Sequence, residues 1–497
     1  MKTHKNLMIM GTASGVGKSA TVTALCRIFQ KDGYRVCPFK SQNMALNSYV
    51  TKDGKEMGRA QAVQAEAIGL EPQAWMNPIL LKPSQDKKIQ IIIEGKSFGN
   101  LTGAEYHKYK QKLLPKLEEI YHMIEENYDI SVIEGAGSPA EINMLEEDIS
   151  NFGMARIADA PVILVADIDR GGVFASIYGT IMLLKEEDRK RVKGIIINKF
   201  RGNKEVLEPG FEIIEKLTGV KTLGVVPYAD FNLEDEDSLS EKYQSFKFSK
   251  HSNHIKVSVI KLKHISNATD MDALSMYEDV EIQFVTERSQ IGKEDMIIIP
   301  GSKNTIDDLK WLKESGIAAE IMKRAKTETI IFGICGGFQM LGKKVKDPYH
   351  IEGEIEELDA LGLFNLETIM EKEKTLVQYK GTLRGEKGML KDLHNLELRG
   401  YEIHQGVTRG DEENLTDDDR IVFVNKDNIM ATYLHGIFDN KEFTEALLNE
   451  IRRRKGLKEI NHNISYEEYK RKEFDKLEKL VRENVDIDTI YKIMGLK

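Results

Sequence analysis

Two short glycine-rich segments, far apart in the chain, carry residue types that can do chemistry. The first, Gly11–Ser19, reads Gly-Thr-Ala-Ser-Gly-Val-Gly-Lys-Ser and follows an apolar run. The second, Ile331–Met340, places a cysteine between glycines, again after an apolar run. The first segment is typical of a loop that holds nucleotide phosphates, and the second of a turn that exposes a nucleophile. An enzyme with both would consume a nucleotide and attack a carbonyl or amide carbon, and glutamine-dependent amidation is the most familiar such chemistry.

The first segment has the residue order of a phosphate-binding loop. Gly15 and Gly17 would let backbone N–H groups approach phosphate oxygens, Lys18 would reach the terminal phosphates, and the Ser19 hydroxyl would ligate Mg²⁺. The loop is one residue longer than the standard one when counted from Gly11. Glycine-rich turns also arise for structural reasons, but Gly-Lys-Ser opening a helix favours a nucleotide site.

The second segment predicts a reactive thiol at Cys335. A tight turn between a strand and a helix lifts such a side chain above the sheet, and a helix N-terminus favours the thiolate. Cys26 and Cys37 fit buried structural cysteines instead. A cysteine nucleophile needs a base, and the candidates are His435, which follows an apolar run, and His404.

Bulk properties exclude several classes of protein. A chain of 497 residues suggests two or three domains, and a formal charge of −9 argues against a nucleic-acid binder. No apolar stretch approaches the roughly 20 residues of a membrane span, and a cleavable leader would remove the phosphate loop. The three cysteines fit a reducing cytoplasm, and no cysteine or histidine spacing suggests a structural zinc. The expectation is a cytoplasmic enzyme whose oligomeric state the sequence leaves open.

The elements that must position these residues read as an α/β fold with two doubly wound domains. Short apolar runs alternate with helical patterns over residues 1–230 and again over 254–440, which predicts parallel sheets covered on both faces. Residues 231–253 read as a linker, and 441–497 as a helical extension that we expect to be a solvated cap. The strand candidates are Leu7–Met10, Arg35–Phe39, Ile130–Ile133, Val162–Ala166, Gly194–Asn198, Leu223–Val226, Ile255–Ile260, Glu281–Val285, Met296–Ile299 and Thr329–Phe332.

The first half resembles dethiobiotin synthetase and related carboxylate-activating enzymes. The loop variant carries the resemblance, together with Val132–Gly137, a strand end where those enzymes have a Mg²⁺-binding glutamate. The resemblance implies that Glu134 is a metal ligand beside Ser19. It also implies that Asn198, which follows another strand, contacts the base of ATP.

The second half resembles the class I glutamine amidotransferases. Their cysteine elbow is followed about a hundred residues later by the catalytic histidine, which implies His435 rather than His404. Pro300–Lys303 resembles the loop that supplies an oxyanion-hole N–H, so Gly301 and Gly336 are the expected donors. That family has a glutamate two residues past the histidine, whereas this chain has Ile437. The third member of the triad therefore stays unassigned.

The whole pattern resembles the cobyric acid synthases, within the cobyrinate amidotransferases. The further stretches that carry this resemblance are Pro38–Ser48, Gly58–Gln61, Met76–Pro83, Asp167–Phe174 and Arg399–His404. The resemblance implies amidation of the b, d, e and g carboxylates of adenosylcobyrinic acid a,c-diamide, with glutamine as the ammonia source and MgATP as the activator. Three alternatives stay open: an a,c-diamide synthase, a partitioning-type ATPase that lacks a glutaminase, and a pseudo-amidotransferase second domain that only regulates.

Overall fold

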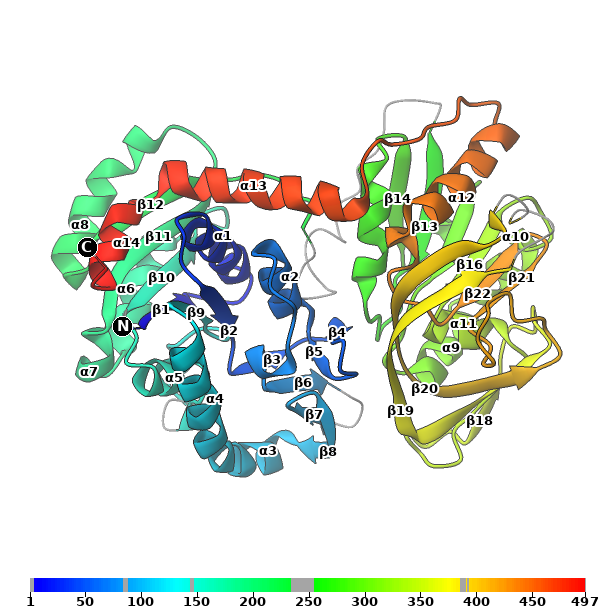
Figure 1. The fold of residues 1–497 in the computed structure, drawn as a ribbon, viewed down its shortest axis with the longest axis horizontal. Helices are drawn as coiled ribbons and strands as arrows, with labels where there is room; N and C mark the ends of the chain where they lie inside the picture. Colours follow the sequence, from blue (N-terminus) through cyan, green and yellow to red (C-terminus); the bar gives the residue numbers. More distant parts are fainter. Residues whose placement is uncertain are drawn as a thin grey trace.

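Two α/β units lie side by side in the computed structural model (Figure 1), which describes residues 4–83, 88–143, 147–233, 254–384, 390 and 393–496. Each unit has a six-stranded sheet whose neighbouring strands are mostly parallel. Residues 234–253 lie outside the described part, so most of the expected linker does too. The expected fold class, α/β with two doubly wound units, is confirmed.

The first sheet is parallel throughout, in the strand order β12-β11-β10-β1-β9-β2. Leu7 and Ile9 of β1 belong to one apolar cluster, and Met8 and Met10 belong to another. Because alternate residues of a strand point to opposite faces, both faces of this sheet are covered. The elements are β1 (Lys5–Gly11), α1 (Lys18–Lys31), β2 (Val36–Phe39), α3 (Gly103–Lys110), α4 (Leu114–Asn127), β9 (Ile130–Glu134), α5 (Phe152–Ile157), β10 (Val162–Asp167), α6 (Val173–Leu183), α7 (Glu186–Arg189), β11 (Val192–Phe200), α8 (Glu208–Thr218) and β12 (Thr222–Pro227).

An insertion between β2 and α3 forms smaller sheets that the apolar pattern did not predict. Its strands are short, and they pair as β3-β6-β7-β8 and as the hairpin β4-β5. The elements are β3 (Gln42–Met44), β4 (Ser48–Val50), β5 (Glu56–Gly58), α2 (Arg59–Ala67), β6 (Ile79–Pro83), β7 (Lys88–Ile93) and β8 (Lys96–Thr102). In Figure 1 this insertion faces the second unit.

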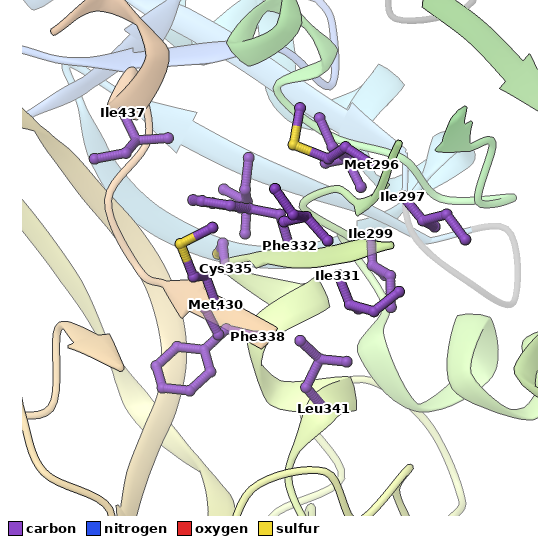
Figure 2. Packing of buried hydrophobic residues seen from close by; sticks show 14 of the residues in the cluster. Met296, Ile297, Ile299, Ile331, Phe332, Cys335, Phe338, Leu341, Met430 and Ile437 are labelled. Atoms are coloured by element: carbon purple, nitrogen blue, oxygen red, sulfur yellow. The ribbon is translucent and has the colours of Figure 1, made fainter. Parts of the chain in front are cut away.

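The second sheet has the order β14-β13-β15-β16-β22-β21, with only β21 antiparallel to its neighbour. A separate sheet contains the long antiparallel pair β19–β20. The elements are β13 (Ile255–Ile260), β14 (Val280–Val285), β15 (Met296–Ile299), α9 (Thr305–Glu314), α10 (Ile317–Arg324), β16 (Ile330–Ile334), α11 (Gly336–Leu341), β17 (Lys344–Lys346), β18 (Glu357–Asp359), β19 (Leu366–Leu383), β20 (Leu396–Gly410), β21 (Phe423–Lys426) and β22 (Ile429–Thr432). Figure 2 shows Cys335 beside the buried apolar side chains of this unit.

The C-terminal segment is helical, as expected, but it is not a solvated cap. Helix α12 (Lys441–Arg454) packs in the core of the second unit. Helix α13 (Tyr466–Asn484) then runs back to the first unit, where α14 (Ile487–Ile493) ends the described chain (Figure 1). Leu477 and Val481 are buried in the same apolar cluster as α1, because one face of α13 is apolar and lies against that helix. Among the described residues, no helix is long and apolar enough to cross a membrane.

Candidate active site

The loop after β1 closes around glycines that no other residue could replace without strain. Gly17 has φ 99°, and a Cβ there would lie 2.1 Å from the Asn198 amide nitrogen. That amide donates to the Val16 carbonyl at 2.9 Å, and Lys199 Nζ donates to the Gly15 carbonyl at 2.8 Å. The structure therefore brings Asn198, expected at the base of ATP, directly against the predicted phosphate loop.

Lys18 begins α1 and is almost fully buried. Its ammonium donates to the carbonyls of Ala13 and Gly137, each at 3.1 Å. The first carbonyl belongs to the loop and the second to the turn after β9. An ammonium group held by two neutral carbonyls could exchange them for phosphate oxygens, as the role predicted for Lys18 requires.

Ser19 and Glu134 meet, as the resemblance implies. Ser19 Oγ donates to Glu134 Oε1 at 2.9 Å, and Glu134 is fully buried. Its carboxylate also accepts from Lys40 Nζ at 2.8 Å and from the Gln64 amide. A hydroxyl and a carboxylate are the hard oxygen ligands that Mg²⁺ takes together with substrate phosphates, so this pair fits the expected metal. Lys40 and Gln64 had no role in the sequence analysis, although Lys40 lies in one of the stretches that carry the resemblance.

Cys335 sits on a strained turn between β16 and α11. Its φ of 51° and ψ of −105° are unusual for a residue with a side chain, and strain of this kind is concentrated at functional sites. Its backbone N–H donates to the Thr432 carbonyl at 2.8 Å. The turn also needs glycine behind it, because a Cβ on Gly337 would lie 1.9 Å from the Ile299 carbonyl oxygen. This is the geometry that the nucleophile elbow predicts.

His435 lies beside Cys335 and has an acidic partner that the sequence did not reveal. His435 Nδ1 and Asp270 Oδ2 are 2.7 Å apart, and the second Asp270 oxygen accepts the Gly436 N–H at 2.9 Å. Both side chains are buried. Asp270 lies in a 3-10 helix (Ala268–Met276) that follows β13, so it comes from a different part of the chain than the glutamate of the class I enzymes. The three side chains have the arrangement of a nucleophile, a base and an orienting carboxylate.

The environment of His435 favours its protonated form. Burial alone would lower the pKa of His435, but the Asp270 carboxylate and the Cys335 sulfur, which is also a hydrogen-bond partner, raise it to about 10. An imidazolium beside a sulfur favours the thiolate, which is the nucleophilic form. Burial raises the pKa of Cys26 and of Cys37 well above the usual range, so neither is a rival nucleophile.

Gly301 and Gly336, the expected oxyanion-hole donors, come together around this pair. A Cβ on Gly301 would lie 3.1 Å from His435 Cε1, and one on Gly336 would lie 2.8 Å from the Ser302 nitrogen. The loop after β15 therefore packs against both the elbow and the base. Their N–H groups as oxyanion donors stay a prediction.

His404 shares a cavity with Cys335 but is engaged elsewhere. Its Nε2 lies 3.1 Å from a Glu402 oxygen, its Nδ1 lies 2.8 Å from the Gly406 carbonyl, and its ring stacks on Tyr433. Both ring nitrogens thus have partners other than the sulfur. This geometry favours His435 over His404 as the base.

The two units touch next to Cys335 and His435. The Ser48 N–H of β4 donates to the Asn267 side chain at 3.0 Å, and Tyr401 OH donates to the Ser48 carbonyl at 3.2 Å. The Tyr401 ring in turn stacks on His435 with centroids 5.3 Å apart. Along this route His435, the expected base, is therefore separated from the first unit by the Tyr401 side chain alone.

Comparison with known proteins gives matches over both halves of the chain. A model for a CobQ/CobB/MinD/ParA nucleotide binding domain matches residues 7–238, and one for a CobB/CobQ-like glutamine amidotransferase domain matches residues 256–443. The nucleotide loop lies in the first match, and Cys335, Asp270 and His435 lie in the second.

Curated relatives cover almost the whole chain. Proteins named cobyric acid synthase from Clostridium tetani (strain Massachusetts / E88) and Alkaliphilus metalliredigens (strain QYMF) are each 52% identical to it, over 99% and 98% of this chain and 99% of each relative. One of the same name from Clostridium botulinum (strain Loch Maree / Type A3) is 50% identical over 99% of both chains. At this identity and coverage, the chain belongs to the cobyric acid synthase family.

Proposed function

We propose that this enzyme amidates the b, d, e and g carboxylates of adenosylcobyrinic acid a,c-diamide, using ATP and ammonia released from glutamine. Membership of the family makes the chain a glutamine-hydrolysing ligase of cobalamin biosynthesis. The single observation that best supports the proposed substrate is the identity of about half of all residues to cobyric acid synthases over the full chain.

In the first unit, Gly15, Gly17, Lys18 and Ser19 would hold the nucleotide. The substrate carboxylate attacks the γ-phosphorus, ADP leaves, and an acyl phosphate forms on the corrinoid. Lys18 would offset the charge that develops on the transferring phosphoryl group. Mg²⁺, held by Ser19 and Glu134, would supply further neutralisation of that charge.

In the second unit, the Cys335 thiolate would attack the side-chain amide carbon of glutamine. The N–H groups of Gly301 and Gly336 would stabilise the oxyanion, and His435 would donate a proton to the departing ammonia. Water then releases glutamate from the thioester, with His435 as the base. The freed ammonia displaces phosphate from the acyl phosphate to give the amide.

The test is to supply the purified protein with adenosylcobyrinic acid a,c-diamide, glutamine and MgATP, and to follow the corrinoid by mass spectrometry. Successive replacement of carboxyl groups by amides is expected, together with release of glutamate and ADP. An unchanged a,c-diamide, together with amidation of cobyrinic acid at its a and c positions when that acid is supplied instead, would support the sister activity and refute the proposal.

A further inference from the structure

A cluster of charged side chains lies in the cavity beside Cys335, and two of its members come from the first unit. We call it the interface cluster: Glu56 and Lys82 from the first unit, and Lys303, Glu352 and Lys374 from the second. Lys82, Lys303, Glu352 and Lys374 line the same cavity as Cys335. The catalytic steps above use none of these five side chains.

Part of the cluster is a buried ion triplet that joins the two units. Glu56 pairs with Lys82 at 2.6 Å and with Lys374 at 2.7 Å. Burial would raise the pKa of Glu56, but the two lysines hold it well below its usual value, so it stays ionised. One carboxylate thus serves two ammonium groups, and the triplet keeps one excess positive charge.

Lys303, in the loop that follows Gly301, and Glu352, whose carboxylate accepts from the first turn of α9, form the other part. Burial and the nearby Lys374 lower the pKa of Lys303 to about 8, while Glu352 and Glu56 oppose that change. Burial raises the pKa of Glu352 to about 7 even though its carboxylate accepts the Ile306 N–H at 3.1 Å. For both groups, the surrounding residues do not fully replace the hydration that the charged form loses on burial. This is expected of groups that bind a charged ligand.

The charge balance of the cluster defines the chemistry of that ligand. Its three ammonium groups face two carboxylates, so the cavity favours a ligand that brings a carboxylate. The charge of Asp347 also raises the pKa of Glu352, but Asp347 does not line the cavity. Its carboxylate accepts hydrogen bonds from the backbone N–H groups of Ile351 and Glu352. A ligand with a carboxylate for Lys303 and an ammonium group for Glu352 would satisfy both, and an α-amino acid carries that pair on one carbon.

We propose that Lys303 binds the α-carboxylate and Glu352 the α-ammonium group of glutamine, and that Lys82 completes this head-group site from the first unit. The inference rests on the proposed function, because it takes Cys335 as the group that attacks the other end of the same molecule. It also makes the glutamine site a composite of both units, so the second unit alone lacks part of its substrate contacts.

The test compares three amides: glutamine, glutaramate, which lacks the α-ammonium group, and 4-aminobutanamide, which lacks the α-carboxylate. Ammonia release is measured with the wild type, Lys303→Met, Lys303→Arg, Glu352→Gln and Lys82→Met. The control is Lys263→Met, which removes an exposed lysine of the same unit. Because a hydrogen bond to a charged group is worth about 1.5–3 kcal/mol, its loss should raise KM roughly 10- to 100-fold.

Lys303→Met should raise KM for glutamine and for glutaramate and leave KM for 4-aminobutanamide unchanged. Lys303→Arg keeps the positive charge and should bring both raised KM values back toward those of the wild type. Glu352→Gln should raise KM for glutamine and for 4-aminobutanamide and leave KM for glutaramate unchanged. Lys82→Met should raise KM for glutamine by a smaller factor. Equal effects on all three amides, or a fall in kcat alone, would overturn the assignment. A second result would also overturn it: variants with an unchanged KM for glutamine that release more glutamate than they form amide. That result would make the cluster part of an ammonia path.

Calorimetric titration of glutamine into Cys335→Ser separates this inference from the proposed function. In one outcome, the wild type does not hydrolyse glutamine, but Cys335→Ser binds it, and adding Lys303→Met to that variant abolishes the binding. The head-group site then stands and the glutaminase proposal fails. If the wild type hydrolyses glutamine and Lys303→Met leaves binding and KM unchanged, the proposed function stands and the head-group site is refuted.

Discussion

Replacing Asp270 with asparagine isolates the contribution of the carboxylate that holds His435. The change keeps the shape of the side chain and removes its charge. In the structure that carboxylate accepts from His435 and from the Gly436 N–H, so the amide would lose the charge-assisted contact to the ring and could stabilise the wrong tautomer. We expect slow glutamine hydrolysis with little change in the fold.

The pKa of His435 sets the size of this effect. That pKa is raised from 6.5 to about 10 against the opposing effect of burial, and the causes are Asp270 and Cys335. Since one pKa unit corresponds to about 1.4 kcal/mol, the net effect of burial and the two neighbours favours the imidazolium by on the order of 5 kcal/mol. If Asp270 supplies half of that, its loss slows the reaction about 100-fold. A wrong tautomer adds to the loss, and the corresponding change in a serine protease triad costs about 10⁴-fold.

The assay is single-turnover formation of the thioester on Cys335, followed across the pH range, beside ammonia-dependent amidation as a measure of the intact first unit. The expected result is a loss of about 10²- to 10⁴-fold in thioester formation, with ammonia-dependent amidation retained. Asp419→Asn, at an exposed carboxylate of the same unit, is the control and should behave as wild type. Wild-type thioester formation by Asp270→Asn would refute the argument that this carboxylate orients the base.

The remaining predictions concern both units. Lys18→Ala should abolish amidation from glutamine and from ammonia alike, because no other loop residue carries charge to the transferring phosphate; turnover with ammonia at the wild-type rate would make the loop structural. Cys335→Ser should abolish glutamine use and retain amidation with ammonium salts, whereas equal loss of both would contradict separate sites. Because the pKa of Lys303 is lowered to about 8 and only its protonated form binds a carboxylate, kcat/KM for glutamine should fall above about pH 8, and Lys303→Arg should move that fall to higher pH. Leu477→Ala should lower the free energy of unfolding by about 2–4 kcal/mol in denaturant titrations, while Lys479→Ala, exposed on the same helix, should change it little.

Ten strands of the two central sheets could be predicted because most of them are short apolar runs with buried side chains, whereas β21 and β22 of the second sheet were not among the predicted strands. Met296–Ile299 was predicted with the bounds that the structure has, and the other predicted strands agree with the observed ones within a few residues. The phosphate loop and the cysteine elbow could also be found, because all their residues are consecutive. Strand β19 was not predicted: its buried and exposed residues alternate at its two ends, but its middle is exposed or half-buried and interrupts that alternation.

The parts that sequence reasoning missed are brought together only by the fold. Asp270 contacts a histidine 165 residues further along the chain, and Glu56 contacts Lys374 at a separation of 318 residues. Neither acidic residue lies in a segment with a recognisable spacing. Leu477 and Val481 did predict an amphipathic helix, but their partner is α1, at the other end of the chain. The spacing of apolar residues shows which face of a helix will be buried, but it does not show which element that face will contact.

The contact between the two units gives the enzyme a physical means of linking glutamine hydrolysis to the state of the first unit. Ser48 of β4 is held by Asn267 through its N–H and by Tyr401 through its carbonyl, and Tyr401 stacks on His435. A displacement of β4 must therefore change the packing around the base. Since coupling between binding sites is reciprocal, any change that a bound corrinoid makes in glutamine affinity has an equal counterpart in corrinoid affinity when glutamine binds. The interface cluster also spans both units, so the proposed head-group site for glutamine lies at the same boundary.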